Sequence, residues 1–331
     1  LSLTKSKRES LTQAGCEREG AAVKARYVRE QKTICGKEYM EVDLLNVTAS
    51  EHRASVRAKK QFASSLAMKR CNDRNALRKL RWKVSENFTE RKKKTWLVHL
   101  TYSEDFLPEY DEDAQKALTN YIERLNRRQR QKYKEAMAKD HHNPGGVLRK
   151  VKYIAVTEFQ HADEEKGLKE VRYHHHMILE CDLSIDEIKD LWVTRCGKGW
   201  VEPLGLVKAD RAEFDKGGLD AYCEYITKYE GKRTHKWRQS KGLRMPTQPR
   251  PNDTRYTPRK LAEAATLYID DKKFWEDRYG VLKLGHGEVR QYAFVGAEPR
   301  FNEVTAEWHV IARFWADPRR QETKKAVRRW E

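Results

Sequence analysis

The sequence predicts an α+β protein built on an antiparallel sheet, in the split βαβ arrangement of ferredoxin-like folds. The first observation is the order of elements between residues 95 and 232, which is β-α-β-β-α-β-α. The second is the presence of nine Trp and fifteen Tyr, enough aromatic residues to close a core. The third is an exclusion, because 17 Gly, 9 Pro and 6 Cys in 331 residues are not the composition of collagen, coiled-coil rods or disulfide scaffolds. We expect helices mainly on one face of the sheet and chemistry on the other.

Four segments of this core have the apolar, β-branched composition of strands. They are TWLVHLTY at 95–102, VKYIAVTEFQ at 151–160, VRYHHHMILE at 171–180 and GWVEPLGLVKAD at 199–210. Pro203 interrupts the last segment, because proline cannot donate a hydrogen bond to a strand ladder.

Three segments alternate with these strands as predicted helices. The first is the charged stretch 111–139, whose apolar residues recur at helical spacing from Ala117 to Leu125. The second begins at Ser184 and runs to about Thr194, with Glu187 in the position of a capping-box acid. The third covers 219–232 and follows a Gly-Gly pair.

The composition along the chain predicts three regions. Residues 1–94 form a basic, mostly helical N-terminal extension. Within it, 1–50 show weak periodicity and are expected to be a poorly ordered lead-in, and 53–94 contain 15 Lys and Arg against 3 acids. Residues 95–246 form the core. Residues 247–331 form a mixed accessory region that begins with a proline-rich linker, followed by a helix from Thr257-Pro258 to about Tyr279.

The charge balance indicates a polyanionic partner. The chain has 68 Lys and Arg against 50 Asp and Glu, so its net charge is +18. No run approaches the ~18 apolar residues that span a bilayer, and the first residues lack the apolar run of a signal peptide. The six cysteines form no CxxC pair. We therefore expect a cytoplasmic protein with reduced thiols and no membrane partner.

The run Tyr173 to Leu179 contains three consecutive histidines and predicts a metal site. Side chains alternate along a strand, so His174 and His176 share one face, while His175 points to the other. If strands 151–160 and 171–180 pair as a hairpin, Glu158 approaches the two histidines. Such a set suits Mn²⁺, Mg²⁺ or Zn²⁺. The alternatives are a chance histidine cluster and a solvent-facing carboxylate at the end of a strand.

A tyrosine-rich helix, at 219–232, follows the fourth predicted strand. Spacings of three and four place Tyr222, Tyr225 and Tyr229 on one helix face, with Lys228 beside it. A tyrosine can attack a phosphodiester, although ionising a phenol of pKa ~10 at neutral pH costs about 4 kcal/mol, which a nearby cation must offset. The alternative is that these rings are the core stripe of an amphipathic helix.

These motifs resemble those of a known superfamily. His174-x-His176 resembles the HUH motif of rolling-circle replication initiators and relaxases, and YITKY at 225–229 is similar to the Tyr-x-x-Lys-Tyr helix of microvirus initiators. LVHLTY at 97–102 resembles the first motif of that superfamily, and SKGLRMP at 240–246 resembles the stretch downstream of its tyrosine helix. The resemblance covers residues 95–246. His175 departs from it, because a bulky hydrophobic residue usually stands between the two histidines, and this leaves the metal register open by one residue.

The resemblance implies an endonuclease that nicks single-stranded origin DNA and rejoins it. It implies that Tyr225 is the principal nucleophile, Tyr229 the second one, and Lys228 a neighbour of the transferred phosphoryl group. A divalent metal, Mn²⁺ or Mg²⁺, would be held by His174, His176 and Glu158. We expect the single strand to contact the basic residues Arg70, Arg74, Arg78, Lys79, Arg81 and Lys232.

The sequence contains no GxxxxGK[ST] phosphate-binding motif, so we expect a host helicase and polymerase to act in trans. A conjugative relaxase or an HUH transposase would use the same chemistry. A non-catalytic nucleic-acid-binding protein with a structural metal is the alternative from a different class.

Overall fold

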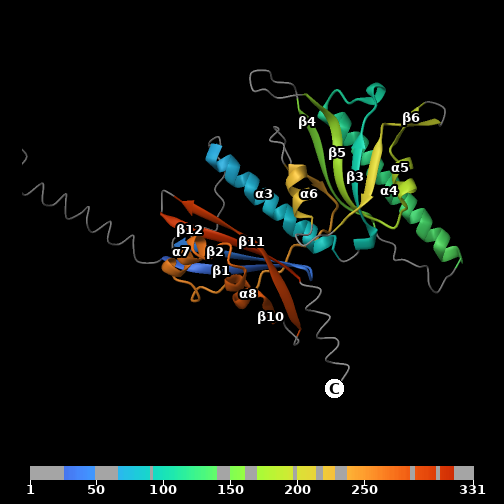
Figure 1. The fold of residues 1–331 in the computed structure, drawn as a ribbon. Coiled ribbons are helices and arrows are strands. Elements are labelled where there is room, and N and C mark those ends of the chain that lie inside the picture. The colour runs from blue at the N-terminus through green and yellow to red at the C-terminus, as the bar shows by residue number, and fades with distance from the viewer. Residues whose placement is uncertain are drawn as a thin grey trace, which may run out of the picture. The chain divides into compact units, whose positions relative to one another are not determined.

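The computed structural model describes ten segments of the chain, which form two compact units (Figure 1). The segments are 26–48, 66–89, 92–139, 150–160, 170–196, 200–213, 219–227, 237–283, 288–302 and 306–316. One unit comprises Leu66–Met245, and the other combines Leu1–Ser65 with Pro246–Glu331. Both are mixtures of helices with an antiparallel sheet, so the chain has an α+β fold.

The Leu66–Met245 unit is built on a sheet with strand order β8-β3-β5-β4-β9, in which every neighbouring pair is antiparallel. The strands are β3 (Thr95–Thr101), β4 (Lys152–Gln160), β5 (Val171–Glu180), β8 (Val207–Arg211) and β9 (Arg238–Gln239). The strands predicted at 95–102, 151–160 and 171–180 are confirmed, because their β-branched residues pack on both sides of this sheet.

One face of this sheet is covered by the long helix α4 (Asp111–Lys139), as predicted (Figure 1). Leu118, Tyr121 and Leu125 of α4 are fully buried against Val98 and Met177 of the central strands. The apolar stripe at helical spacing therefore makes the core on this side.

Two helices lie on the other face, where α3 (Leu66–Asn87) and α6 (Asp220–Thr227) pack on a second apolar cluster. Leu80 and Val84 of α3 meet Cys223 and Ile226 of α6 over Ile178 of β5. Helices thus cover part of both faces, and the expectation of helices mainly on one face is wrong. The physical reason is that Ile154, Val156 and Ile178 give the second face its own apolar surface to bury.

The predicted helix at 184–194 ends early. Its capping box at Ser184 and Glu187 is present, but α5 spans only Ile185–Asp190. Trp192 leaves the helix to enter the α4-side core, and β6 (Val193–Cys196) then pairs with β7 (Trp200–Pro203). The β-branched residues after Trp192 favour that strand. Two short 3-10 helices, η1 (Lys92–Lys94) and η2 (Glu104–Phe106), flank β3.

The second unit is a five-stranded sheet of order β1-β2-β12-β11-β10 with two helices. Its strands are β1 (Arg26–Cys35), β2 (Tyr39–Thr48), β10 (Val281–Lys283), β11 (Val289–Asn302) and β12 (Glu307–Ala316). The prediction of a poorly ordered lead-in over 1–50 is therefore wrong for 26–48, which form a hairpin that turns at Gly36 with a φ of 56°. Polar residues buried by distant partners, such as Glu30, hide the strand period in the sequence.

The helix predicted from Thr257 to Tyr279 is two helices, α7 (Pro258–Thr266) and α8 (Lys272–Tyr279). Thr257 caps α7 as predicted, and the side chain of Asp271 caps α8 by accepting from the backbone N–H of Phe274. Trp275, buried in the core, donates its Nε1–H to the carbonyls of Tyr268 and Ile269 and so holds the turn between the helices.

The unit boundaries differ from the three predicted regions. Helix α3 belongs to the unit that contains the core sheet, so the division lies at 65/66 and not at residue 94. Residues 26–48 pair through β2 with β12, which joins the N-terminal and C-terminal regions in one sheet. Among the described residues, no helix combines the length and apolar character needed to cross a membrane.

Candidate functional site

The strand register brings four chemically active side chains to the α6 side of the core sheet. On β5, His174 and His176 lie on this face beside Ile178. The residue opposite His176 on β3 is His99, and the residue opposite His174 on β4 is Glu158. Directly opposite residues of an antiparallel pair point to the same side, so the four side chains converge.

The distances match those of a metal-binding group. One ring nitrogen from each of His99, His174 and His176 lies within 4.8 Å of the others. Oε2 of Glu158 lies 3.2 Å from Nε2 of His174 and 3.7 Å from Nε2 of His176. The ring centroids of His99 and His176 are 4.5 Å apart, and the two planes differ by 11°.

The hydrogen bonds leave the inward-facing atoms available. His174 donates its Nδ1–H to the carbonyl of Arg172 at 2.8 Å, which keeps the lone pair of Nε2 toward the cluster. Within the described residues, Nε2 of His99, Nε2 of His176 and both oxygens of Glu158 are buried without a hydrogen bond. Buried polar atoms without partners are costly, and a bound cation would satisfy all four.

The electrostatics set the protonation states that a cation requires. Burial, reinforced by His176, His174 and Lys208, lowers the pKa of His99 to about 4, so this ring is neutral at physiological pH. Burial by itself raises the pKa of Glu158, but its close contacts with the rings of His174 and His176 outweigh burial and lower that pKa to about 2. The site therefore offers a neutral imidazole at His99 and an ionised carboxylate at Glu158.

His175 lies on the opposite face, in the α4-side core. Its Nε2 is 2.7 Å from the hydroxyl of Tyr102, and its Nδ1 is 2.9 Å from Oγ1 of Thr157. Thr157 in turn accepts from Gln115 of α4. His175 is thus a fully buried histidine whose two ring nitrogens both have partners. The metal register that the sequence left open by one residue, with His175 on the Glu158 face, does not occur.

Helix α6 places Tyr225 beside the cluster. The ring centroid of Tyr225 is 5.0 Å from that of His176, in an edge-on arrangement, and the side chain is 50% exposed. Tyr222, one turn earlier, packs against the α3–α6 apolar cluster, and burial raises its pKa. Lys228, Tyr229 and Lys232 lie outside the described residues.

Arg81 differs from its expected role as a DNA contact. It is buried on α3, with Nε 3.2 Å from Oδ1 of Asp220 and a second ion pair from Nη2 to Oε1 of Glu224. Both acids are on α6, so Arg81 fixes the helix that carries Tyr225. The acidic side chains of α6 draw Arg81 inward. The spacing of basic residues along α3 does not by itself reveal this pairing.

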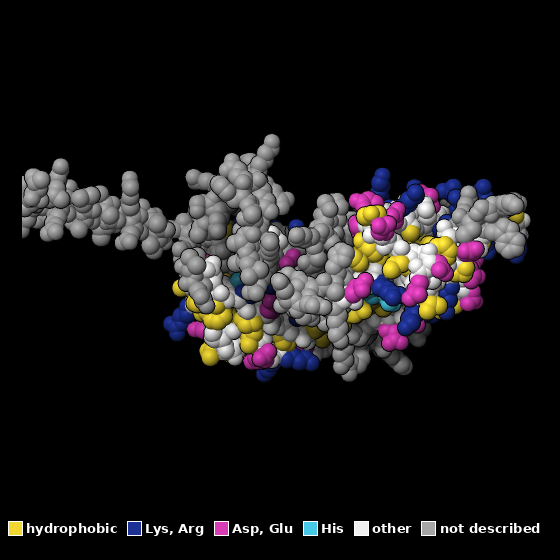
Figure 2. Space-filling view, turned by 90° about the horizontal axis from the view of Figure 1, so that it is seen from above, with side chains coloured by type: hydrophobic (Ala, Val, Ile, Leu, Met, Phe, Trp, Pro, Cys, Tyr) yellow, Lys and Arg dark blue, Asp and Glu magenta, His cyan; other side chains and the backbone are white. Residues whose placement is uncertain are grey.

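The other basic residues of α3 divide into two groups. Arg74 and Lys79 are exposed, whereas the guanidinium of Arg78 lies 4.7 Å from the ring centroid of Trp82. Arg70 lies in α3, and its side chain is outside the described set. On the face drawn in Figure 2, Lys and Arg side chains alternate with Asp and Glu, so the positive charge there is not one continuous patch.

His99 was missing from the predicted ligand set. Its only signal in the sequence is a polar residue at an inward position of an otherwise apolar strand, between Val98 and Leu100. That signal is equally typical of a satisfied core histidine such as His175. The register of β3 against β5, which places His99 opposite His176, distinguishes the two.

The site therefore consists of three imidazoles, one carboxylate and one half-exposed phenol on one face of a sheet. Their elements come from positions as far apart as residues 99 and 225. Comparison of the chain with protein-family models, with curated proteins and with solved structures found no match.

Proposed function

We propose that this protein nicks and rejoins single-stranded DNA at a rolling-circle replication origin, with Tyr225 as the attacking nucleophile. The observation that carries the proposal is the position of Tyr225 beside the cluster of His99, His174, His176 and Glu158. A tyrosine adjacent to buried ligands for a cation is a constellation suited to phosphodiester transfer.

The topology supports the same proposal. Strand order β8-β3-β5-β4, with α4 connecting β3 to β4 and α5 lying between β5 and β8, corresponds to the split βαβ arrangement expected from the sequence. In that arrangement the two central strands are β3 and β5, which carry the three histidines. This strand order supports the proposal alongside the motifs quoted from the sequence.

The proposed reaction transfers the scissile phosphoryl group from the 3′ oxygen of the strand to Tyr225. The Tyr225 oxygen attacks the scissile phosphorus and forms a P–O bond to tyrosine as the phenolic proton passes to solvent. The bond from phosphorus to the 3′ oxygen breaks, and the leaving 3′ oxygen takes up a proton from solvent. The products are a 5′-phosphotyrosine and a free 3′-OH that a polymerase can extend. A divalent cation, when bound, would polarise the phosphate and offset its developing charge. Because the phosphodiester energy is kept in the covalent link, rejoining needs no ATP.

The ligand set bears on the choice of metal. Three imidazoles with one carboxylate suit Mn²⁺ or Zn²⁺ better than Mg²⁺, which prefers oxygen ligands. We therefore propose Mn²⁺ ahead of Mg²⁺.

Tyr229 is proposed as the second nucleophile and Lys228 as the cation near the phosphoryl group, as the motif implies. A host helicase and polymerase remain proposed partners.

One observation favours a second candidate function. The three histidines and Glu158 are mutually arranged without any contribution from Tyr225, as they would be at a structural metal site. A non-catalytic single-strand-binding protein with a structural metal is therefore the alternative. A conjugative relaxase or an HUH transposase would share the first mechanism and differ only in its DNA substrate.

One experiment separates these functions. The full chain is incubated with 5′-labelled and 3′-labelled single strands from candidate origins, with Mn²⁺ or with EDTA. We expect a Mn²⁺-dependent nick and a covalent protein–DNA adduct, whose modified tyrosine is mapped by mass spectrometry. Metal binding without any nick or adduct on all strands tested would favour the structural-metal alternative.

A further inference from the structure

A cavity lies beside the helix pair α7–α8, in the unit that does not contain the proposed nicking site. Its volume is about 490 Å³, within the range of small-molecule sites. Its lining includes Arg255, Lys260, Tyr268, Lys273, Phe274 and Arg278. No residue of the proposed nicking site is among its lining residues. We propose that this cavity binds one nucleotide, with the base stacked on Tyr268 and the phosphate held by Lys260 and Lys273.

The aromatic wall has the geometry of a stacking platform. The rings of Tyr268 and Phe274 are parallel, with centroids 4.5 Å apart and planes 4° apart. The guanidinium of Arg278 lies 3.7 Å from the centroid of Phe274, which requires it to occupy the other side of that ring. Tyr268 is 37% exposed and has no other ring contact among the described residues. A nucleobase on its free face would extend the stack by one layer.

The platform is held rigidly before any ligand binds. The indole Nε1–H of Trp275, which is fully buried, donates to the carbonyl of Tyr268 at 2.8 Å and to that of Ile269 at 3.2 Å. The carboxylate of Asp271 accepts from the backbone of Phe274 at 3.0 Å. The backbone that carries both rings is thus fixed at the same turn, which reduces the ordering needed on binding.

The charges at the mouth leave two cations available. The ammonium groups of Lys260 and Lys273 are exposed and form no ion pair within the described chain. Of the acids that line the cavity, Glu263 is paired with Arg259 at 3.1 Å, and Asp271 is used as the cap of α8. Asp277 has no such partner among the described residues. It therefore opposes a phosphate, and its removal should strengthen binding.

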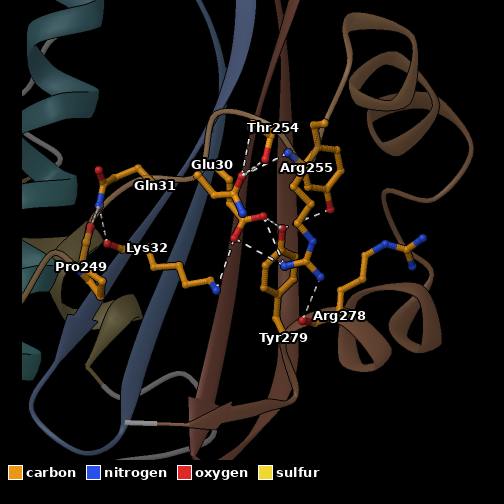
Figure 3. A network of polar contacts seen from close by, with 10 residues as sticks. Glu30, Gln31, Lys32, Pro249, Thr254, Arg255, Arg278 and Tyr279 are labelled. Carbon is orange, nitrogen blue, oxygen red and sulfur yellow. Dashed lines mark hydrogen bonds and ion pairs between the residues drawn. The ribbon is translucent and has the colours of Figure 1, made fainter. Parts of the chain in front are cut away.

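Arg255, which lines the cavity, is held in a network of polar contacts (Figure 3). Arg255 reaches from the loop before α7 to Glu30 of β1 at 3.3 Å, and Glu30 also accepts from the hydroxyl of Tyr279 at 3.0 Å. Arg255 also donates to the carbonyl of Arg278 at 3.3 Å. Because Glu30 and the Arg278 carbonyl already engage Arg255, phosphate recognition falls to the two lysines at the mouth.

Photochemical cross-linking tests the proposal on the full chain. The probes are a single strand of about 12 nucleotides containing 5-iodouracil, and 5-iodo-deoxyuridine monophosphate alone. EDTA is present, so that no metal-dependent step contributes. Trypsin releases the peptide 261–272, in which Tyr268 is the only aromatic residue. We expect an adduct on Tyr268. Cross-linking by the strand alone assigns the site to a nucleotide within a chain, and cross-linking by the monophosphate assigns it to a free nucleotide as well.

Matched variants make the test decisive. Tyr268→Ala should weaken probe binding by roughly 5- to 150-fold, as expected for one base stack, and Tyr268→Phe should keep it. Lys260→Gln with Lys273→Gln should lower the adduct yield, Asp277→Asn should raise it, and Lys283→Gln on β10 should not change it. His176→Ala should leave it unchanged, which separates this site from the nicking site. Adducts on other peptides but none on 261–272 would overturn the proposal, as would an unchanged yield in the double lysine variant.

Discussion

His99 and His176 stack ring on ring across β3 and β5, with centroids 4.5 Å apart, and neither Nε2 has a hydrogen bond within the described residues. The two buried Nε2 atoms have lost their contact with water, which is unfavourable, and a cation bound to both would compensate for that loss. The pair lies on the two central strands of the sheet, so the fold itself positions the proposed metal ligands.

The first prediction concerns metal affinity. His99→Ala and His176→Ala should each lower the affinity for Mn²⁺ by more than about 10-fold, because each removes a ligand that no neighbour replaces. Titration calorimetry on the folded variants measures the change. Single-strand binding should survive. His309→Ala, in the other unit, is the control and should bind Mn²⁺ like the wild type. Unchanged affinity in His99→Ala would remove this residue from the ligand set.

The second prediction concerns the nucleophile. Tyr225→Phe keeps the ring beside His176 and removes only the attacking oxygen, so the covalent adduct should vanish or move to Tyr229. Tyr222→Phe is the matched control, since this neighbouring ring packs in the apolar cluster and should not affect the adduct. Mass spectrometry of the trapped adduct decides. An undiminished adduct in the Tyr225→Phe, Tyr229→Phe double variant would contradict the role given to this helix.

The third prediction is a loss of stability in acid at Glu187. Burial raises the pKa of this carboxyl, but hydrogen bonds from Lys132, from the backbone of Ser184 and from Arg128 outweigh it and lower the pKa to about 2. A group with a depressed pKa stabilises the fold above its ordinary value of 4.5, and this contribution is lost as the pH falls from there toward 2. Solvent screening of these partly exposed ion pairs leaves a contribution of about 1 kcal/mol.

Denaturant unfolding at several pH values tests this contribution. Glu187→Gln should be less stable than the wild type at neutral pH, and the difference should shrink below the ordinary pKa of the carboxyl. Glu123→Gln, at an exposed position of α4, should show no such pH dependence. A constant difference across the whole pH range would show that Glu187 acts through packing alone.

The fourth prediction concerns a close backbone approach at Gly205. A Cβ at this position would overlap the carbonyl of Thr101, at the end of β3. Gly205→Ala should therefore destabilise the protein by about 1–3 kcal/mol, because backbone must move. Gly296→Ala is the control, since nothing lies within 4 Å of its added methyl group, and it should change stability by less than about 0.5 kcal/mol. Equal thermal unfolding of the two variants would refute the overlap.

The fifth prediction concerns salt. The affinity for single strands should fall with salt with a log–log slope of ~−0.7 per phosphate neutralised. Replacing the exposed Arg74 and Lys79 by Gln should reduce that slope by about 1.4, and Lys189→Gln on α5 should leave it unchanged. Fluorescence anisotropy over a salt series measures both. An affinity that does not change with salt would show that contacts between basic residues and phosphates do not drive strand binding.

Local patterns predicted the parts of the fold that depend on near neighbours in the chain. The stripe of Leu118, Tyr121 and Leu125 predicted α4 with its correct bounds, and the capping box at Ser184 was present as expected. Strand alternation placed His174 and His176 on one face and His175 on the other, because the period of two is a property of the backbone itself. Whether these residues bind metal and transfer a strand stays a prediction.

The tertiary structure alone decided which distant residues meet. His99 joins His176 because β3 pairs with β5, Arg81 turns inward because α6 presents Asp220, and 26–48 become ordered because β2 pairs with β12. Hydrophobic and polar periodicity determines the face on which a side chain lies, but not which strand or helix becomes its neighbour. That choice depends on burying the whole core at once, so only the folded chain completes the site.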